Sequence, residues 1–187
     1  MKKIFTLCLA GALALAATAC DDDDDKDGGY SGKMTVSGQT EEVKSALYYE
    51  YAADGGDEAE IDLYLFKDAL SAMPNAEPSF YVNLEISESL NGKTVDLTKP
   101  IVKSGTLAPY LDIVAANEGQ SFEIDNSEGS IDISVGEADT SLTVTSGTLK
   151  VTKNGGDFSV KLSVKLSDGK SIFADWTGKA TKVTIPE

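Results

Sequence analysis

The strict alternation of apolar and polar residues over 158–166 is the sequence feature that most constrains the fold. Every even position from Phe158 to Leu166 is apolar, and every odd position between them is Ser or Lys. Side chains along a strand point alternately to the two faces of its sheet, so the pattern predicts a strand with one buried face and one solvated face. Half-buried strands of this kind are typical of antiparallel sheets.

The turns on either side of this strand follow from the same parity. Residues opposite each other across a hairpin share a face, so the correct register must place apolar residues opposite apolar residues. A two-residue loop at Gly155-Gly156 pairs Val151 with Val160. A three-residue loop at 167–169, ending in a left-handed glycine, places Val160 opposite Trp176 and turns this tryptophan toward the core.

Similar but weaker alternation occurs upstream. It predicts strands at 47–51, 61–65 and 80–86, and near 32–38, 121–125, 130–135, 141–146 and 182–185. Asn91-Gly92 predicts a two-residue hairpin that pairs Ile86 with Leu97. Lys67 to Met73 fits a short turn of helix ended by a proline, and 109–117 fits either a short helix or a strand.

The predicted elements add up to an all-β domain over residues 30–187. About ten short strands with one or two short helices predict an antiparallel β-sandwich or a flattened up-and-down, calycin-like barrel. The chain has 187 residues, of which 41% are hydrophobic, and this suffices for one folded core. The alternation of the strands does not distinguish the sandwich from the barrel.

The N-terminus has the composition of a secretion signal. Lys2 and Lys3 precede an apolar segment over 4–19. As a helix this segment would span roughly 24 Å, which is short for a hydrocarbon core of about 30 Å. Residues 1–19 are therefore predicted to be a removable signal peptide and not a permanent membrane helix.

The sequence Ala17-Thr18-Ala19-Cys20 ends this segment and resembles the lipobox of bacterial lipoproteins, which more often has Leu where this chain has Ala17. The resemblance implies cleavage before Cys20 and acylation of its thiol and its new amino group. Each buried CH₂ contributes about 0.8 kcal/mol, so several fatty chains on one residue would hold the protein at a membrane.

A run of acidic residues follows Cys20 directly, namely Asp21, Asp22, Asp23, Asp24 and Asp25. Such a run cannot pack, so residues 20–29 are predicted to form a lipidated, flexible tether. The run also resembles the surface-export signal of Bacteroidetes lipoproteins, which implies display on the outer face of the outer membrane. Spacer and export signal remain alternatives, and the spacing of the run does not fit a calcium loop.

Composition excludes several functions. The formal net charge is −15, every basic residue is a lysine and there is no histidine. Phosphate would be repelled, so no nucleic-acid partner is expected. Ser-His and Cys-His catalytic pairs and imidazole metal sites are also excluded. We therefore expect no cofactor and no metal, and name no catalytic residue.

Two acidic clusters are candidate sites. The first, around 54–60, is interpreted as a solvated loop, and no motif selects a carboxylate pair for glycosidic hydrolysis. The second, from Asp125 to Asp132, is interpreted as a β-turn with acidic flanks, because its spacing does not fit a calcium loop. The first cluster consists of Asp54, Asp57, Glu58 and Glu60.

Aromatic residues suggest a ligand site. If Tyr49 and Leu63 point inward, then aromatic side chains on the same two strands point outward and form a platform for a sugar ring or a partner protein. The candidate ligand-binding residues are Tyr48, Tyr64 and Phe66. The competing interpretation is that the segment 67–73 lies over this face and buries it as a second small core.

Three functions remain in competition. The favoured one is a lipid-anchored, non-catalytic surface module that binds a glycan or a protein. The second is a structural or assembly subunit of a fimbria or the envelope, which would add a strand at an exposed sheet edge. The third is a hydrolase that uses carboxylates.

Overall fold

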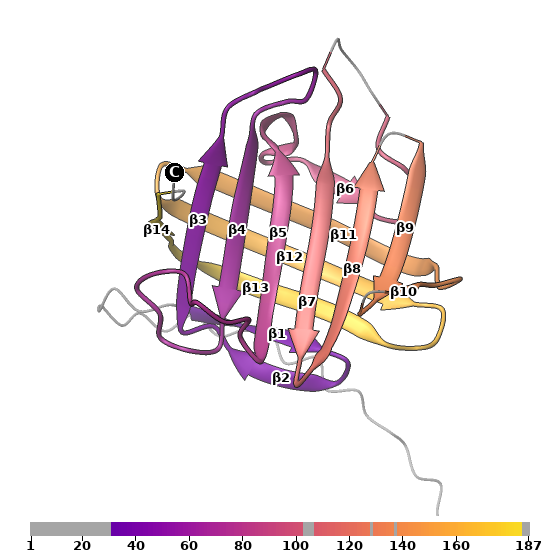
Figure 1. Cartoon of the computed structure of the whole chain (residues 1–187), viewed down its shortest axis with the longest axis horizontal. Coiled ribbons are helices and arrows are strands. Elements are labelled where there is room, and N and C mark those ends of the chain that lie inside the picture. Colours follow the sequence, from indigo (N-terminus) through magenta and orange to yellow (C-terminus); the bar gives the residue numbers. More distant parts are fainter. Residues whose placement is uncertain (1–30, 103–106, 128, 137, 185–187) are drawn as a thin grey trace, which may run out of the picture.

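The computed structural model describes residues 31–102, 107–127, 129–136 and 138–184 and shows an antiparallel β-sandwich (Figure 1). One sheet has six strands and the other has eight, and their strands cross at a steep angle. Both sheets have free edges, so the described strands form the predicted sandwich and not the alternative closed barrel.

The six-stranded sheet contains the first two strands of the chain, one short strand from its middle and three long strands from its C-terminal part. Its order is β2 (Gln39–Glu42), β1 (Ser31–Val36), β13 (Ser171–Lys179), β12 (Asp157–Leu166), β11 (Val144–Asn154) and β6 (Thr94–Asp96). All of its neighbouring strands are antiparallel.

The eight-stranded sheet faces the viewer in Figure 1. Its order is β10 (Ala138–Asp139), β9 (Ser130–Val135), β8 (Gln120–Ser127), β7 (Leu111–Asn117), β5 (Phe80–Ser87), β4 (Glu60–Phe66), β3 (Ser45–Tyr51) and β14 (Thr181–Lys182). Only β14 runs parallel to its neighbour, β3. The hairpin β8–β9 confirms the predicted turn between Asp125 and Asp132, which lie opposite each other.

The C-terminal meander has the predicted registers. Val151 pairs with Val160 across the loop at 155–156, and Val160 pairs with Trp176 across the loop at 167–169. Gly169 has φ +89°, the left-handed conformation that the three-residue turn requires. Trp176 is fully buried, as its parity predicted.

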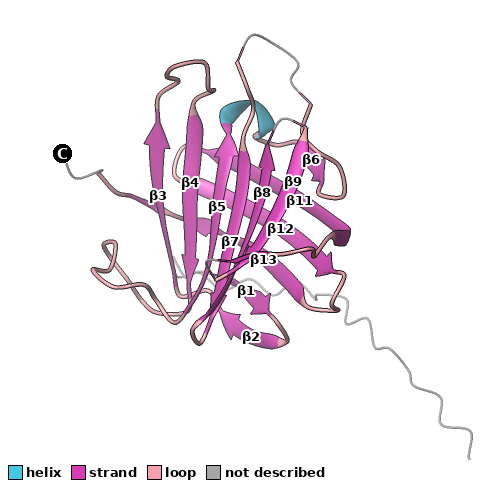
Figure 2. Ribbon diagram, turned by 45° about the vertical axis from the view of Figure 1, so that its right-hand side comes forward, coloured by secondary structure: helices cyan, strands magenta, loops and turns pink. Residues whose placement is uncertain are grey.

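The predicted helices are absent from the described residues, where the only helical element is one 3₁₀ turn, η1 (Glu88–Leu90), drawn in cyan in Figure 2. Residues 67–73 form bends. The hydroxyl of Ser45 donates to the carbonyl of Asp68 at 2.6 Å and accepts from the amide of Leu70 at 3.1 Å, so a side chain uses the backbone groups that a helix would need. The segment 109–117, for which the sequence fits either a helix or a strand, contains the central strand β7.

The hairpin predicted at Asn91-Gly92 is wrong. The glycine is left-handed (φ +76°), but the chain crosses here from the eight-stranded sheet to the six-stranded sheet, where β6 pairs with β11. Leu97 therefore does not pair with Ile86. The Gly92 amide donates to the carbonyl of Val151 at 2.7 Å, so the segment completes the edge of β11 instead of returning along β5.

The main core lies between the two sheets. It is built from the inward residues of both, and its largest fully buried side chains include Trp176, Phe80, Phe122, Phe158 and Met34. No helix in the described part of the chain is long and apolar enough to cross a membrane. The outer face of the eight-stranded sheet carries a second, smaller apolar cluster and the polar features described next.

Candidate functional site

Five carboxylates lie directly opposite one another across five consecutive strands of the eight-stranded sheet. The pairings run from β4 through β5, β7 and β8 to β9, and each member is the direct cross-strand partner of the next. Directly opposed residues have Cβ atoms about 4.5–5.5 Å apart and share a face of the sheet. We call this set the carboxylate row: Asp62, Glu85, Asp112, Asp125 and Asp132.

The row lies on the outer face of the sheet, yet part of it is buried. Asp62 is 3% exposed and Asp112 is 6% exposed. The carboxylate of Asp62 accepts hydrogen bonds from the side chains of Asn83 and Tyr64. One oxygen of Asp112, Oδ1, is buried and has no hydrogen-bond partner among the described residues, and the same holds for Oδ1 of Asp125.

Burial and nearby carboxylates raise the proton affinity of four carboxyls of the row, those of Asp62, Glu85, Asp112 and Asp125. Desolvation is the main cause in each case, and it raises the pKa of Asp62 to about 6 and the pKa of Glu85 to about 7. The pKa of Asp112 also rises to about 7, through burial and then through the charges of Glu123 and Glu85. None of the four ion pairs found in the described part of the chain involves the row. The row is therefore a set of like charges that no lysine of the described residues compensates.

A cleft of about 680 Å³ opens beside the row, and Glu85 belongs to both. Ligand sites in proteins are commonly concave, with aromatic walls and a few polar groups that fix orientation. The walls of this cleft combine two tyrosines with five acidic residues. Its lining includes Tyr51, Tyr110, Asp54, Asp57, Glu58, Glu60, Glu85 and Ser127.

Two hydrogen-bonded segments, the loop after β3 and the segment before β7, form one side of the cleft. The loop after β3 meets the segment before β7 through the Ala108 amide, which donates to the carbonyl of Gly56 at 3.0 Å, and the Glu58 amide, which donates back to Ala108 at 3.4 Å. Gly56 has φ +129°, a conformation that favours glycine. These contacts fix the acidic loop against the sheet.

Tyr110 is positioned by a pair of hydrogen bonds to Ser87. Its amide donates to the serine hydroxyl at 2.6 Å, and its carbonyl accepts from the serine amide at 2.9 Å. Tyr51 on the other side is 36% exposed and is the first ring of a series that crosses the outer face. Successive centroids in the series lie 5.8–6.3 Å apart, through Tyr51, Tyr49, Tyr64, Phe66 and Tyr81.

The proposed aromatic platform is only partly formed. Tyr48 lies on the inner face, opposite Leu63, and packs edge-on against Phe158 with centroids 5.0 Å apart. The prediction that Tyr48 points outward with Tyr64 and Phe66 is therefore wrong. The pattern misled because residues 45–48 are all buried, so that apolarity does not tell the two faces of β3 apart.

Tyr64 and Phe66 do lie on the outer face, but the second small core covers the phenylalanine. Phe66 is 1% exposed, and Leu70 and Met73 from the following loop pack over its cluster. Tyr64 is half-buried and belongs to the same cluster. The competing interpretation, in which the segment 67–73 covers this face, describes the structure.

The acidic loop around 54–60 is exposed at Asp54 and Asp57, as a solvated loop would be, but it also forms part of the cleft. All four of its acidic residues line the cleft. Burial raises the pKa of Glu60, and Oε2 of Glu58 is buried without a hydrogen-bond partner in the described part of the structure. Sequence analysis missed the rest of the site, although Asp62, Glu85 and Asp125 each occupy a polar position in an alternating strand.

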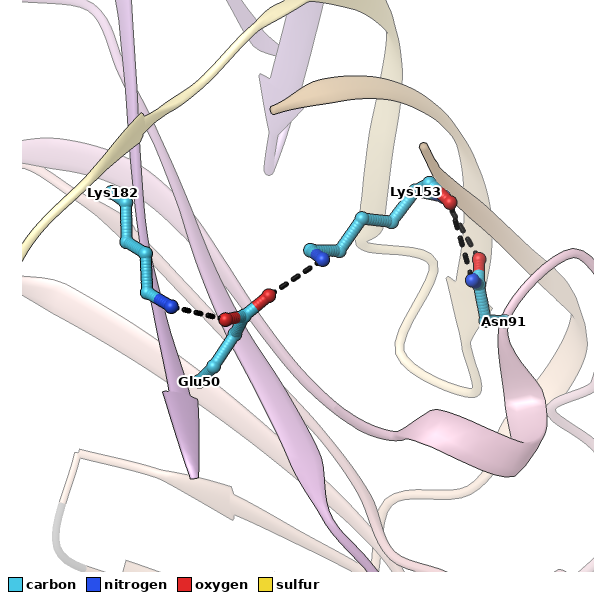
Figure 3. Close-up of polar contacts among 4 residues, drawn as sticks. All are labelled: Glu50, Asn91, Lys153 and Lys182. Carbon is cyan, nitrogen blue, oxygen red and sulfur yellow. Dashed lines mark hydrogen bonds and ion pairs between the residues drawn. The ribbon is translucent and has the colours of Figure 1, made fainter. Parts of the chain in front are cut away.

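A second, smaller cleft of about 390 Å³ shares Tyr51, Ala52 and Glu60 with the first. At its edge Glu50 bridges Lys153, at 2.6 Å, and Lys182, and these hydrogen bonds lower the pKa of the Glu50 carboxyl (Figure 3). The side chain of Asn91 bonds both the amide and the carbonyl of Lys153, at 2.8 and 3.3 Å. The lysines of this region are thus already paired with a carboxylate outside the row.

The predicted lipidation site Cys20 and the acidic run over residues 21–25 lie outside the described residues. Among the described residues, no three His, Cys, Asp or Glu side chains are grouped so that they could hold a metal ion. Comparison with known proteins finds no matching family model, no matching curated protein and no matching solved structure.

Proposed function

We propose that the protein is a lipid-anchored, non-catalytic module of the outer-membrane surface and that it binds a glycan in the cleft beside the carboxylate row. The observation that carries the proposal is the pairing of Tyr51 and Tyr110 with acidic side chains in one concave site. Tyrosine rings stack on the apolar faces of sugars, and carboxylates accept hydrogen bonds from sugar hydroxyls.

The placement of the cleft suits a tethered binder. Loop 52–59, which lines the cleft, lies at the opposite end of the sandwich from β1 and β2 (Figure 1). The first described residue, Ser31, opens β1. A lipidated tether before this strand would leave the cleft facing away from the membrane, and the expected signal at 1–19, Cys20 and the acidic run supply such a tether.

The carboxylates of the cleft support binding better than hydrolysis. Glu60 and Glu85 are diagonal neighbours on β4 and β5, with backbones roughly 7–8 Å apart, so their carboxyls are close enough to be weighed as a glycosidase pair. Catalysis, however, needs one carboxyl held protonated and its partner held ionised. Burial raises the pKa of both carboxyls, and no described residue that lines the cleft carries a positive charge that would hold one of them ionised.

Strand addition, as in a fimbrial subunit, receives less support from the edges of the sheets. The outermost strands of the two described sheets are β2, β6, β10 and β14, and they have only four, three, two and two residues. Very short edge strands are a common protection against pairing with another chain.

The test is glycan binding by a soluble chain of residues 28–187, which keeps every described strand and omits the acidic run. We expect Tyr51→Ala and Tyr110→Ala each to weaken binding about two- to tenfold, because each removes a stacking surface worth about 0.5–1.5 kcal/mol. Phe173→Ala is the matched control, since Phe173 is 41% exposed on the other sheet. Absence of binding at millimolar glycan, or an equal loss with the control, would refute the proposal. Release of shorter sugars would indicate the hydrolase instead.

A further inference from the structure

We propose that the cleft selects ligands that carry a protonated amine, and that among glycans it prefers amino sugars with a free amino group to their N-acetylated forms. This inference rests on the proposed function, since it names the class of glycan that the same cleft would take.

The charge of the cleft carries the first part of the case. Its lining contains five acidic residues and, among the described residues, no lysine. The lysines of the neighbouring cleft, Lys153 and Lys182, are bound to Glu50. A neutral sugar would leave these acidic charges uncompensated, whereas an ammonium group would offset part of their repulsion.

Asp112 supplies an independent observation. It is 6% exposed and lies directly opposite Glu85 on the same face of the sheet. Its carboxyl accepts a hydrogen bond from the Ile113 amide, but its Oδ1 atom lacks a partner among the described residues. Buried polar atoms are nearly always hydrogen-bonded, and an unpartnered one in a native site calls for an explanation. An ammonium group bound at Glu85 would lie next to this carboxyl and would stabilise its charged form.

Among the described residues, every ionisable group whose charge acts on Glu85 has the same sign. The groups are Asp62 and Glu60 on β4 and Glu123 on β8, and Glu85 in turn acts on Asp112 of β7. A bound cation would therefore be attracted from several strands at once. Tyr51 and Tyr110 add to this preference, because aromatic faces attract cations that lie within about 6 Å.

Binding of an ammonium group must also move protons. The raised pKa values of Glu85 and Asp112, both about 7, leave these carboxyls partly protonated at neutral pH. A cation favours their ionised forms and lowers both pKa values, so its binding releases protons to the buffer. A neutral glycan that only stacks on the tyrosines releases none, and this difference provides a second readout.

The experiment compares two tetrasaccharides of the same backbone, fully deacetylated chitotetraose and its fully N-acetylated form. Calorimetry on residues 28–187 is run at pH 5.5, where the amino groups of the sugar are already protonated, in two buffers of different ionisation enthalpy. We expect the deacetylated sugar to bind at least tenfold more tightly and to release protons. In Glu85→Gln the ratio of the two affinities should fall toward one. Asp175→Asn, which removes an exposed charge from the other sheet, should keep the ratio.

Tetralysine, which carries amines but no sugar, is titrated in the same way as a third ligand. Each outcome decides between the two proposals. Equal affinity for the two sugars, or an equal loss with Asp175→Asn, overturns the selection of amines and leaves glycan binding standing. Binding of tetralysine without binding of either sugar overturns glycan binding and supports the selection of amines. If neither sugar nor tetralysine binds, both proposals fail.

Discussion

The outer faces of the two sheets treat charge in opposite ways. On the six-stranded sheet, a row of directly opposed residues crosses β1, β13, β12 and β11 in the order Lys33, Asp175, Lys161 and Lys150. The row places one aspartate between two lysines and contains a single like-charge pair, Lys161 opposite Lys150. All four are exposed. The corresponding row on the eight-stranded sheet is acidic throughout and partly buried.

This difference in charge suggests that the two outer faces have different roles. Opposite charges across strands stabilise a sheet modestly, and like charges directly opposite destabilise it. A protein keeps such a cost where function depends on it, and removing it commonly raises stability at the expense of activity. We infer that the six-stranded sheet serves the fold and that the outer face of the eight-stranded sheet serves binding.

The largest effect should be the loss of stability as the pH rises. Asp62, Glu85 and Asp112 have raised pKa values of about 6, 7 and 7, so between about pH 4 and pH 7 the folded chain holds more protons than the unfolded chain. Stability therefore falls through this window. Urea unfolding should show a drop on the order of 5 kcal/mol, about half of what the three full shifts would give, because the groups interact and Glu85 is partly exposed to solvent. If stability rose from pH 5 to pH 8, the carboxyls of the eight-stranded sheet would not have raised pKa values, and the two sheets would not differ in this way.

A single substitution in each row should sharpen the comparison. Asp112→Asn removes a buried like charge and should stabilise the protein by about 2 kcal/mol at pH 8, with a smaller gain at pH 5. Asp175→Asn removes a charge that lies between lysines and should leave stability unchanged or slightly lower. Denaturant unfolding of both variants tests this, and a loss of stability in Asp112→Asn would contradict it.

In the six-stranded sheet, a change in side-chain volume should affect stability more than a change in charge. A Cβ atom added at Gly178 would lie 2.8 Å from the indole of Trp176. Gly178→Ala should therefore destabilise the protein by about 1–3 kcal/mol through overpacking. The loss should be the same at pH 5 and pH 8, and a strong pH dependence would show that the two sheets are not independent in this respect.

The smallest effect concerns a carboxylate that has partners. Glu50 is held by Lys153 and Lys182, so Glu50→Gln should lower stability, by about 0.5–1 kcal/mol, as expected for a largely exposed ion pair. The sign is opposite to that for Asp112→Asn. A gain in stability would mean that general acidity of the chain, and not local compensation, controls these effects.

The sequence predicted the meander from β11 to β13 in detail because two local signals agree there. Alternation is unbroken from Phe158 to Leu166, and a glycine marks each turn. Asn91-Gly92 carries an equally strong turn signal, but the chain passes here from the eight-stranded sheet to the six-stranded sheet and forms no hairpin. Its partners are Val151 and Lys153, about sixty residues away, and local pattern contains no information on such contacts.

The candidate site could not be assembled in the same way. The carboxylate row depends on the neighbours of β7, whose segment fits a helix as well as a strand, and on the pairing of β5 with β7 across an excursion into the other sheet. Tyr48 was misplaced because both faces of β3 are buried near Leu47. The acidic residues were visible in the sequence, but their alignment is a property of the tertiary structure.

The most direct test is the titration of the Glu85 and Asp112 side chains by carboxyl-carbon NMR, with and without the deacetylated tetrasaccharide. We expect pKa values of about 7 in the free protein, because burial and like charges favour the protonated forms. Both values should fall when the ligand is bound. Ordinary values near 4 in the free protein, or raised values that the ligand leaves unchanged, would contradict the view that this face holds uncompensated charge for a cationic ligand.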